Sequence, residues 1–161
     1  MSDVEATPQA KVLTVSDGVA HGVRDDRSGR TLVEHLEAAG FEVVDHRVTA
    51  DGAEAVATVL VDMTAGFAGL VVSTGGTGFA PRDQTPEGTR AVVERDAPGL
   101  AEAMRLCNPL GRLSRGVAGI RGRSIIINTP GSTNGCVEQL DAVIDVLPHA
   151  LRLLADTDTT H

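Results

Sequence analysis

The stretch from Leu70 to Thr89 reads LVVSTGGTGFAPRDQTPEGT, and it decides the fold that we expect for the whole chain. It opens with a short apolar, β-branched run that is typical of a buried strand. Glycines follow at positions 75, 76 and 78. Thr85 and Pro86 then suit the N-cap and the first turn of a helix. This order of strand, glycine turn and helix predicts an anion site, because backbone amides and the helix dipole both favour phosphate there.

The glycine turn matches neither of the two best-known phosphate-binding patterns. GxxxxGK[ST] is absent, because the only lysine is Lys11. The dinucleotide pattern GxGxxG fails, because Pro81 stands where the third glycine is needed. A turn that needs glycine only for its geometry stays open as an alternative, although Arg82 and Asp83 beside it favour a ligand site.

The composition is that of one globular domain. A chain of 161 residues with 42% apolar residues can bury a core of its own. It has no Trp or Tyr and a formal net charge of -8, which together disfavour stacking on single strands and binding to duplex backbones. Cys107 and Cys136 form no zinc or disulfide pattern. Because no leader or long apolar span is visible, we expect a soluble cytoplasmic protein with neither a nucleic-acid nor a membrane partner.

Strand and helix patterns alternate along the chain. We expect strands over residues 11–16, 41–48, 68–74 and 123–129, with helices between them. The helix after the glycine turn is expected to carry Val92 and Val93 and to be interrupted at Ala97-Pro98, and a last helix is expected to run to about residue 154 with a kink at Pro148. Residues 1–10 are expected to form a loose arm and 155–161 a polar tail, which leaves 11–154 as a single domain. The alternation predicts a three-layer α/β/α fold with a mostly parallel central sheet.

Four loops leave the carboxyl ends of the expected strands. They contain Ser16 and Asp17, Asp51, the turn 75–83, and the second glycine turn 130–135. Ligands of parallel sheets bind beyond these ends, so the four loops should meet on one rim. Two amide-rich turns and several Asp residues suit a nucleotide with Mg²⁺, which prefers carboxylate and phosphate oxygens. The expected chemistry is therefore phosphoryl or nucleotidyl transfer.

Four stretches of the chain resemble the molybdopterin-binding MoaB/Mog family of molybdenum cofactor biosynthesis. They are TVSDG with a following DRSG at 26–29, STGGTGFAPRDQTPEGT, LSRGVAGIRG at 113–122, and TPGSTNG before the last helix. The resemblance spans about residues 11–154. The last stretch departs from the family's PGSPKA or PGNPNA, because Thr133 and Asn134 replace the Pro-Lys or Pro-Asn pair.

The resemblance implies the molybdopterin-binding-domain fold, usually assembled as a homotrimer. It also implies an enzyme that uses ATP and Mg²⁺ to join AMP to the terminal phosphate of molybdopterin, its substrate, with release of pyrophosphate. The molybdate-inserting enzyme of the pathway would then be a further partner. Two alternatives remain: a molybdopterin-binding carrier without turnover, and a trimeric scaffold.

Matching the motifs assigns two acids, Asp51 and Asp83, as catalytic residues and Mg²⁺ ligands. Asp51 would be the second ligand or would orient the attacking phosphate, and its alternative is a helix N-cap in a capping box with Glu54. The alternative for Asp83 is a turn or a cap before the next helix. The residues expected to contact substrate or nucleotide are Ser16, Asp17, Gly75, Gly76, Thr77, Gly78, Arg82, Thr85, Ser114, Arg115, Pro130, Gly131 and Ser132.

Several of these residues have a second interpretation. Ser132 suits a helix N-cap as well as a ligand contact. Ser114 and Arg115 match a family motif but equally suit a contact between subunits. Arg82 either neutralises phosphate or pairs with a neighbouring acid. Cys136 stands near a helix N-terminus, a place that can activate a thiol, but we expect a buried structural cysteine.

Overall fold

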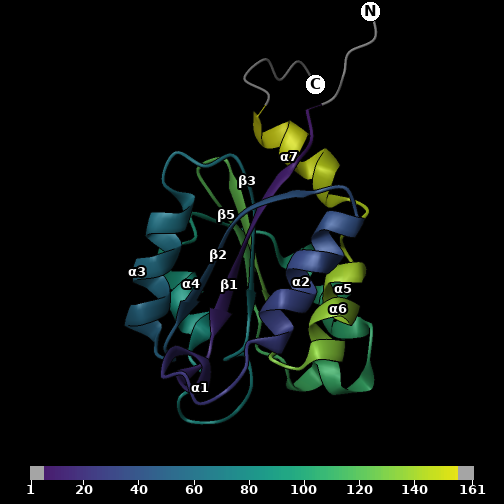
Figure 1. Cartoon of the computed structure of the whole chain (residues 1–161). Helices are drawn as coiled ribbons and strands as arrows, with labels where there is room; N and C mark the ends of the chain where they lie inside the picture. The colour runs from purple at the N-terminus through teal and green to yellow at the C-terminus, as the bar shows by residue number, and fades with distance from the viewer. Residues whose placement is uncertain (1–5, 156–161) are drawn as a thin grey trace, which may run out of the picture.

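Six strands form one sheet in the computed structural model, which describes residues 6–155 (Figure 1). The sheet order is β2-β1-β3-β6-β5-β4. The first four strands in this order are parallel, while β5 is antiparallel to β6 and β4 is antiparallel to β5. The mostly parallel sheet is therefore confirmed. The strands are β1 (Gln9–Val15), β2 (Glu42–Thr49), β3 (Gly69–Thr74), β4 (Arg95–Asp96), β5 (Ala118–Arg121) and β6 (Ser124–Thr129).

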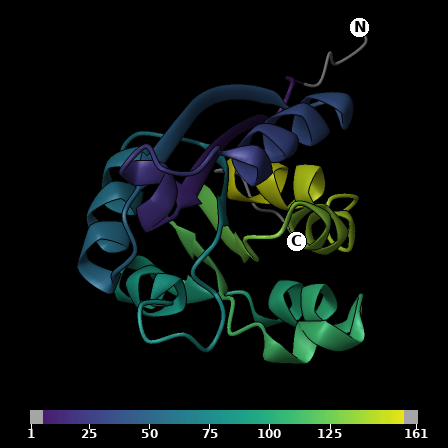
Figure 2. The ribbon, with the colours of Figure 1, turned by 60° about the horizontal axis from the view of Figure 1, so that its bottom comes forward.

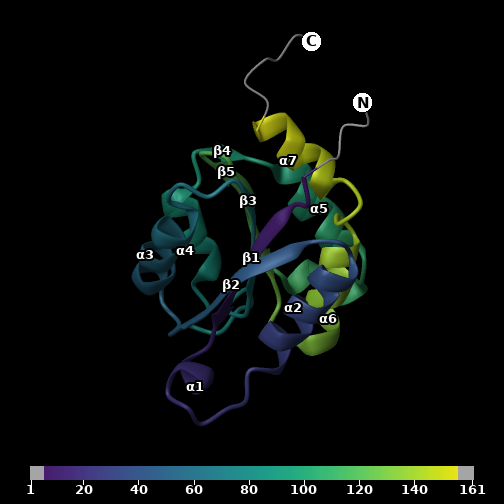
Figure 3. The same cartoon turned by 45° about the horizontal axis from the view of Figure 1, so that its top comes forward.

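Helices cover both faces of the sheet. In Figures 1 and 3, α3 and α4 lie on one side of the strands, and α2, α5 and α6 lie on the other. None of the helices within residues 6–155 combines the length and apolar character that crossing a membrane requires. The helices are α1 (Asp17–Ala20), α2 (Arg27–Ala38), α3 (Ala53–Thr64), α4 (Thr85–Val92), α5 (Pro98–Leu106), the 3₁₀ helix η1 (Pro109–Leu113), α6 (Thr133–Asp141) and α7 (Leu147–Ala155).

The central strands are buried on both faces, which explains their continuous apolar sequences. All six residues of β3 and of β6 are buried. Along β6, Ile125 and Ile127 belong to the core under α2, α5, α6 and α7, while Ile126 belongs to the core under α3 and α4. Successive side chains of a strand point to opposite faces of the sheet, so each strand contributes to two separate cores and the sheet forms the middle layer.

Three expectations about the elements need correction. The last helix is not continuous: α6 ends at Asp141 and α7 begins at Leu147. Pro148 is the second residue of α7, where its missing N–H leaves no helical bond unmade, so it does not kink a longer helix. The helix that follows the glycine turn ends at Val92, and the short strand β4 separates it from α5. Finally, β1 begins at Gln9, so residues 9 and 10 belong to the sheet.

The parallel strands end level with one another. The register pairs Val15 with Thr49, and Thr74 with both Thr14 and Thr129. As a result, the loops after β1, β2, β3 and β6 leave the sheet at the same end, which carries α1 and faces the viewer in Figure 2. The described residues of the expected arm and tail lie at the other end, and residues 1–5 and 156–161 are outside the described part of the chain.

Candidate active site

The loops after β1 and β2 are joined by two acids that bind each other's backbone. The amide of Asp17 donates to Oδ2 of Asp51 at 2.9 Å, and the amide of Asp51 donates to Oδ1 of Asp17 at 3.1 Å. Arg82 reaches across from the loop after β3 and donates to both carboxylate oxygens of Asp17 at 2.6 and 3.0 Å. These bonds lower the pKa of Asp17. Arg82 therefore pairs with a neighbouring acid, which was one of the two roles expected for it.

The helix-cap interpretation of Asp51 is wrong. The N-cap residue of α3 is Gly52, which has no side chain that could cap the helix. The amide of Ala53 instead donates to Oε1 of Gln84 at 3.1 Å. Oδ2 of Asp51 is used by Asp17, whereas Oδ1 accepts no hydrogen bond from residues 6–155. Asp51 therefore has one carboxylate oxygen available for a ligand.

The turn after β3 needs its glycines because other groups approach the backbone closely. Gly75 and Gly76 have φ values of 102° and 69°. A Cβ on Gly76 would lie 2.2 Å from Oγ1 of Thr85. That hydroxyl donates to the carbonyl of Gly75 at 2.9 Å, and the amide of Thr85 donates to the carbonyl of Gly76 at 3.1 Å. Thr85 thus closes the turn, and the expected N-cap role falls to Gln84, which makes no side-chain cap bond.

Asp83 closes the second half of the same turn. Its Oδ2 accepts from the amide of Ala80 at 3.0 Å, so the turn interpretation of Asp83 is confirmed for one oxygen. The other oxygen, Oδ1, accepts no hydrogen bond within the described chain. A Cβ on Gly78 would lie 3.0 Å from Oδ2 of Asp83, so the missing side chain leaves room for the carboxylate beside the glycine backbone.

The second glycine turn packs directly against the first. The amide of Gly75 donates to the carbonyl of Thr129 at 3.0 Å, and Oγ1 of Thr74 donates to the carbonyl of Pro130 at 2.8 Å. A Cβ on Gly131 would lie 3.4 Å from the Cα of Gly75. Ser132 accepts from the amide of Gly135 at 3.0 Å and caps α6, which confirms its cap interpretation. The two turns therefore form one continuous backbone surface.

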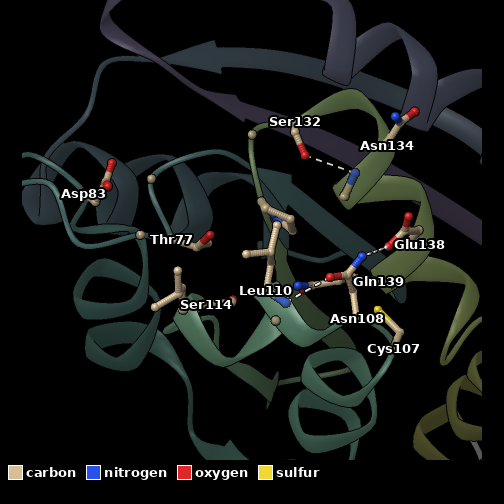
Figure 4. A pocket seen from close by; sticks show the side chains of 17 residues that line it. Thr77, Asp83, Cys107, Asn108, Leu110, Ser114, Ser132, Asn134, Glu138 and Gln139 are labelled. Carbon is tan, nitrogen blue, oxygen red and sulfur yellow. Dashed lines mark hydrogen bonds between the residues drawn. The ribbon is translucent and has the colours of Figure 1, made fainter.

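Two cavities of about 580 Å³ each lie on either side of this backbone surface. They share a wall, and its members are Gly76, Asp83, Gly131 and Ser132. The first, which we call the η1 cavity, extends to Cys107, Leu110, Leu113, Ser114 and Gln139 (Figure 4). The second, which we call the α2 cavity, extends to Ser16, Arg24, Asp26, Arg27 and Asp51. Two ligands of moderate size could thus meet at the shared wall.

Comparisons with known proteins identify the family. The family model described as probable molybdopterin binding domain matches residues 11–149. The chain belongs to this molybdopterin-binding family. It is 37% identical over 150 residues to a molybdopterin adenylyltransferase of Helicobacter pylori strain J99, covering 89% of this chain and 85% of that protein.

Two solved structures support the same assignment. The molybdopterin biosynthesis enzyme MoaB from Thermus thermophilus is 45% identical, with a TM-score of 0.84 and coverage of 91% of this chain and 95% of that one. The molybdopterin biosynthesis Mog protein from Mycobacterium ulcerans is 39% identical, with a TM-score of 0.85 and coverage of 91% and 99%. The expected molybdopterin-binding-domain fold is thereby confirmed.

Most residues that the sequence indicated for this family's site lie at one or both cavities. The η1 cavity holds Thr77, Gly78, Ser114 and Pro130, and the α2 cavity holds Ser16, Asp51 and Gly75. All four residues of the shared wall were also indicated. Four indicated residues line neither cavity and instead hold the surrounding loops together. These four are Asp17, Arg82, Thr85 and Arg115.

Sequence reasoning missed Asp26 as a site residue. Its carboxylate accepts from Oγ1 of Thr14 at 2.9 and 3.0 Å, from the amide of Gly29 at 3.0 Å, and lies 2.9 Å from Nε2 of His46. It thereby caps α2 at the floor of the α2 cavity. The DRSG motif contains this acid, but a motif match alone attaches no chemistry to it.

The apolar side of the η1 cavity was also missed. Leu110 and Leu113 line it and are 73% and 53% exposed. They lie on η1, in a stretch whose periodicity fits neither an α-helix nor a strand, because a 3₁₀ helix has three residues per turn. The three-residue spacing of Leu110 and Leu113 was the feature of the sequence that could have predicted a 3₁₀ helix with both leucines on one face.

The two cysteines differ in setting. Cys136 is fully buried on α6, and burial raises the pKa of its thiol to about 11, as expected for a structural residue. Cys107 is exposed at the η1 cavity, where desolvation and the nearby Glu138 raise the pKa of its thiol.

Proposed function

We propose that the chain is a molybdopterin adenylyltransferase, which transfers AMP from ATP to the terminal phosphate of molybdopterin and releases pyrophosphate. The observation that carries the proposal is the shared wall, where two cavities meet at glycine amides and at Asp83. Adenylylation brings two anionic substrates together at their phosphates. A site with two side cavities and one central phosphate-binding wall suits that geometry.

The chain's own residues then divide the work. One substrate occupies each cavity, so that an oxygen of the pterin phosphate faces the α-phosphorus of ATP. The new O–P bond forms as the bond from the α-phosphorus to the pyrophosphate oxygen breaks, which leaves pyrophosphate as the leaving group. Backbone amides of the two glycine turns orient the phosphates, and their positioning supplies most of the rate.

Asp51 and Asp83 are the residues that would hold Mg²⁺. Both line the α2 cavity, and each keeps one carboxylate oxygen that accepts no hydrogen bond from residues 6–155. In that described range no cluster of three or more His, Cys, Asp or Glu suits a metal ion. Two carboxylates nevertheless fit Mg²⁺, which completes its shell with water and substrate phosphate. When bound, the ion neutralises phosphate charge at the transition state.

Arg24 and Arg27 supply positive charge in a chain whose formal net charge is -8. Both line the α2 cavity. Neither side chain donates a hydrogen bond to another residue in the described part of the chain. They are therefore free to turn toward a phosphate group, for which guanidinium has matching geometry.

A second candidate function is a molybdopterin carrier without turnover. The departure at Thr133 and Asn134 favours it, because these residues begin α6 beside the shared wall and bring no cation there. In either function we expect the homotrimer that the family resemblance implies. Retention of both acids, Asp51 and Asp83, favours the enzyme.

Single-turnover AMP transfer tests the proposal. The protein is mixed with molybdopterin, ATP and Mg²⁺, beside the variants Asp83→Asn and Asp45→Asn. Asp45 pairs with Arg47 on β2 and makes a matched control away from the cavities. We expect product from the parent and from the control, and a rate about 100-fold lower in Asp83→Asn. If the parent binds molybdopterin but forms no product, the protein is a carrier and the enzyme proposal is wrong.

A further inference from the structure

Arg115 reaches the Asp83 turn from a distant part of the chain. It lies between η1 and β5, yet its Nε donates to the carbonyl of Gly78 at 2.8 Å and its Nη2 to the carbonyl of Asp83 at 2.6 Å. Its own amide donates to the carbonyl of Thr77 at 2.9 Å. One side chain and its backbone therefore hold both ends of the segment that carries the candidate metal ligand.

Glu87 fixes the guanidinium from the other side. Nη1 of Arg115 donates to Oε2 of Glu87 at 2.7 Å, and Nη2 donates to Oε1 at 3.1 Å. This two-point pairing uses the planar fork that only arginine has. We call the pair the Arg115–Glu87 clamp.

The clamp leaves Asp83 little freedom. Its backbone amide donates to the carbonyl of Ala80 at 2.9 Å, its carbonyl accepts from Arg115, and its Oδ2 accepts from the amide of Ala80. The direction of Oδ1 follows from these three bonds. Arg115, by contrast, lines neither cavity, and all three of its side-chain nitrogens already donate to groups of its own chain.

We propose that Arg115 is a positioning residue for Asp83, with Glu87 as the partner that orients it, and that it does not itself contact either substrate. The inference rests on the proposed function, since a positioning role shows in the rate only if Asp83 takes part in AMP transfer. The fork geometry carries the argument: Arg115 makes four side-chain hydrogen bonds from three separate nitrogens, whereas a lysine ammonium has three donors on a single nitrogen.

The test compares Arg115→Lys with Arg121→Lys. Lysine keeps the charge at both positions but loses the fork. Arg121 makes a matched control, because its Nη1 donates to the carbonyl of Val92 at the end of α4, away from the turn. Three quantities are measured: the single-turnover rate against Mg²⁺ concentration, the affinities for ATP and for molybdopterin, and hydrogen exchange of the amides from 78 to 83.

For Arg115→Lys we expect a rate about 10- to 100-fold lower, a higher Mg²⁺ requirement, unchanged affinities for both substrates, and faster exchange in the turn. The variant Glu87→Gln should shift the same quantities in the same direction. The double variant should be less affected than the sum of the two single variants, because the two residues act as one unit.

Two results would overturn the proposal. A loss of substrate affinity with normal exchange in the turn would make Arg115 a substrate contact. Exchange equal to that of Arg121→Lys would show that the turn does not depend on the clamp. If the parent makes no product, the proposed function fails by itself, and turn exchange alone then decides whether the clamp holds the turn.

Discussion

At the scale of single residues, Asp51 contributes an acceptor to a loop and is not a helix cap. Asparagine keeps an oxygen for the Asp17 amide, so Asp51→Asn should melt close to the parent while AMP transfer falls about 100-fold. The contrast is Asp26→Ala, which removes the cap of α2 and should lower the free energy of unfolding by about 1 kcal/mol or more. Thermal melts and single-turnover rates measure both. If Asp51→Asn loses as much stability as Asp26→Ala, the role of Asp51 is structural.

Glu87 gives a pH dependence whose sign follows from its partner. Arg115 lowers the pKa of Glu87 below its ordinary value of 4.5 in the folded state. The ion pair therefore stabilises the fold above about pH 4.5, and this contribution is lost as the pH falls through the lower folded pKa. The Glu87 side chain is 45% exposed, so screening keeps the effect small.

Urea unfolding between about pH 3 and 7 measures that contribution. The difference in unfolding free energy between the parent and Glu87→Gln should shrink toward the acidic end. Glu102→Gln, at an exposed position on α5, is the control for the loss of a surface carboxylate. A difference that stays constant with pH would mean that the charge of Glu87 does not stabilise the turn.

At the scale of elements, the turn between β3 and α4 depends on close approach as well as on backbone conformation. Alanine at Gly76 must adopt a positive φ, at about 1–2 kcal/mol, and its Cβ must also displace Thr85, at a further cost of about 1–3 kcal/mol. Gly22 has a similar φ of 74° with no atom near its missing Cβ. Gly76→Ala should therefore be less stable than Gly22→Ala in urea titrations. Equal losses would exclude crowding by Thr85.

The elements also show where sequence reasoning succeeds. A strand that is buried on both faces, such as β6, can be predicted because its sequence is a continuous apolar run. The two-residue β4 is exposed and carries Arg95 and Asp96, so its pairing with β5 comes from tertiary contact alone. The break between α6 and α7 was hidden because Val143 and Ile144 continue an apolar helical stripe across it.

The candidate site was predictable to the extent that it consists of glycine turns. Glycines at 75 and 76 have positive φ, and a local sequence motif reveals that need. The bonds that hold Asp51 and Asp83 were not predictable, because their partners Asp17 and Arg115 lie 34 and 32 residues away along the chain. The local sequence pattern predicted that Asp51 caps α3, but its carboxylate instead accepts a hydrogen bond from the amide of Asp17 in the loop after β1.

At the scale of the whole molecule, the end of the sheet divides one site into two cavities. The shared wall belongs to the loops after β3 and β6, the central strands of the sheet. The η1 cavity is bounded by η1 and α6, and the α2 cavity by the start of α2. With one substrate in each cavity, as we propose, one ligand can be excluded without the other.

A thiol label tests that separation. Cys107 is exposed at the η1 cavity, whereas Cys136 is buried, donates to the carbonyl of Thr133 and has a thiol pKa of about 11. A maleimide at about pH 8 should therefore add once to the native protein and twice in denaturant, as counted by mass. A bulky adduct should abolish binding of either ATP or molybdopterin and leave the other ligand and the melting temperature unchanged. A small S-methyl label on the same thiol is the control and should leave both ligands bound. Loss of both ligands with the bulky label, or of neither, would contradict two separate cavities.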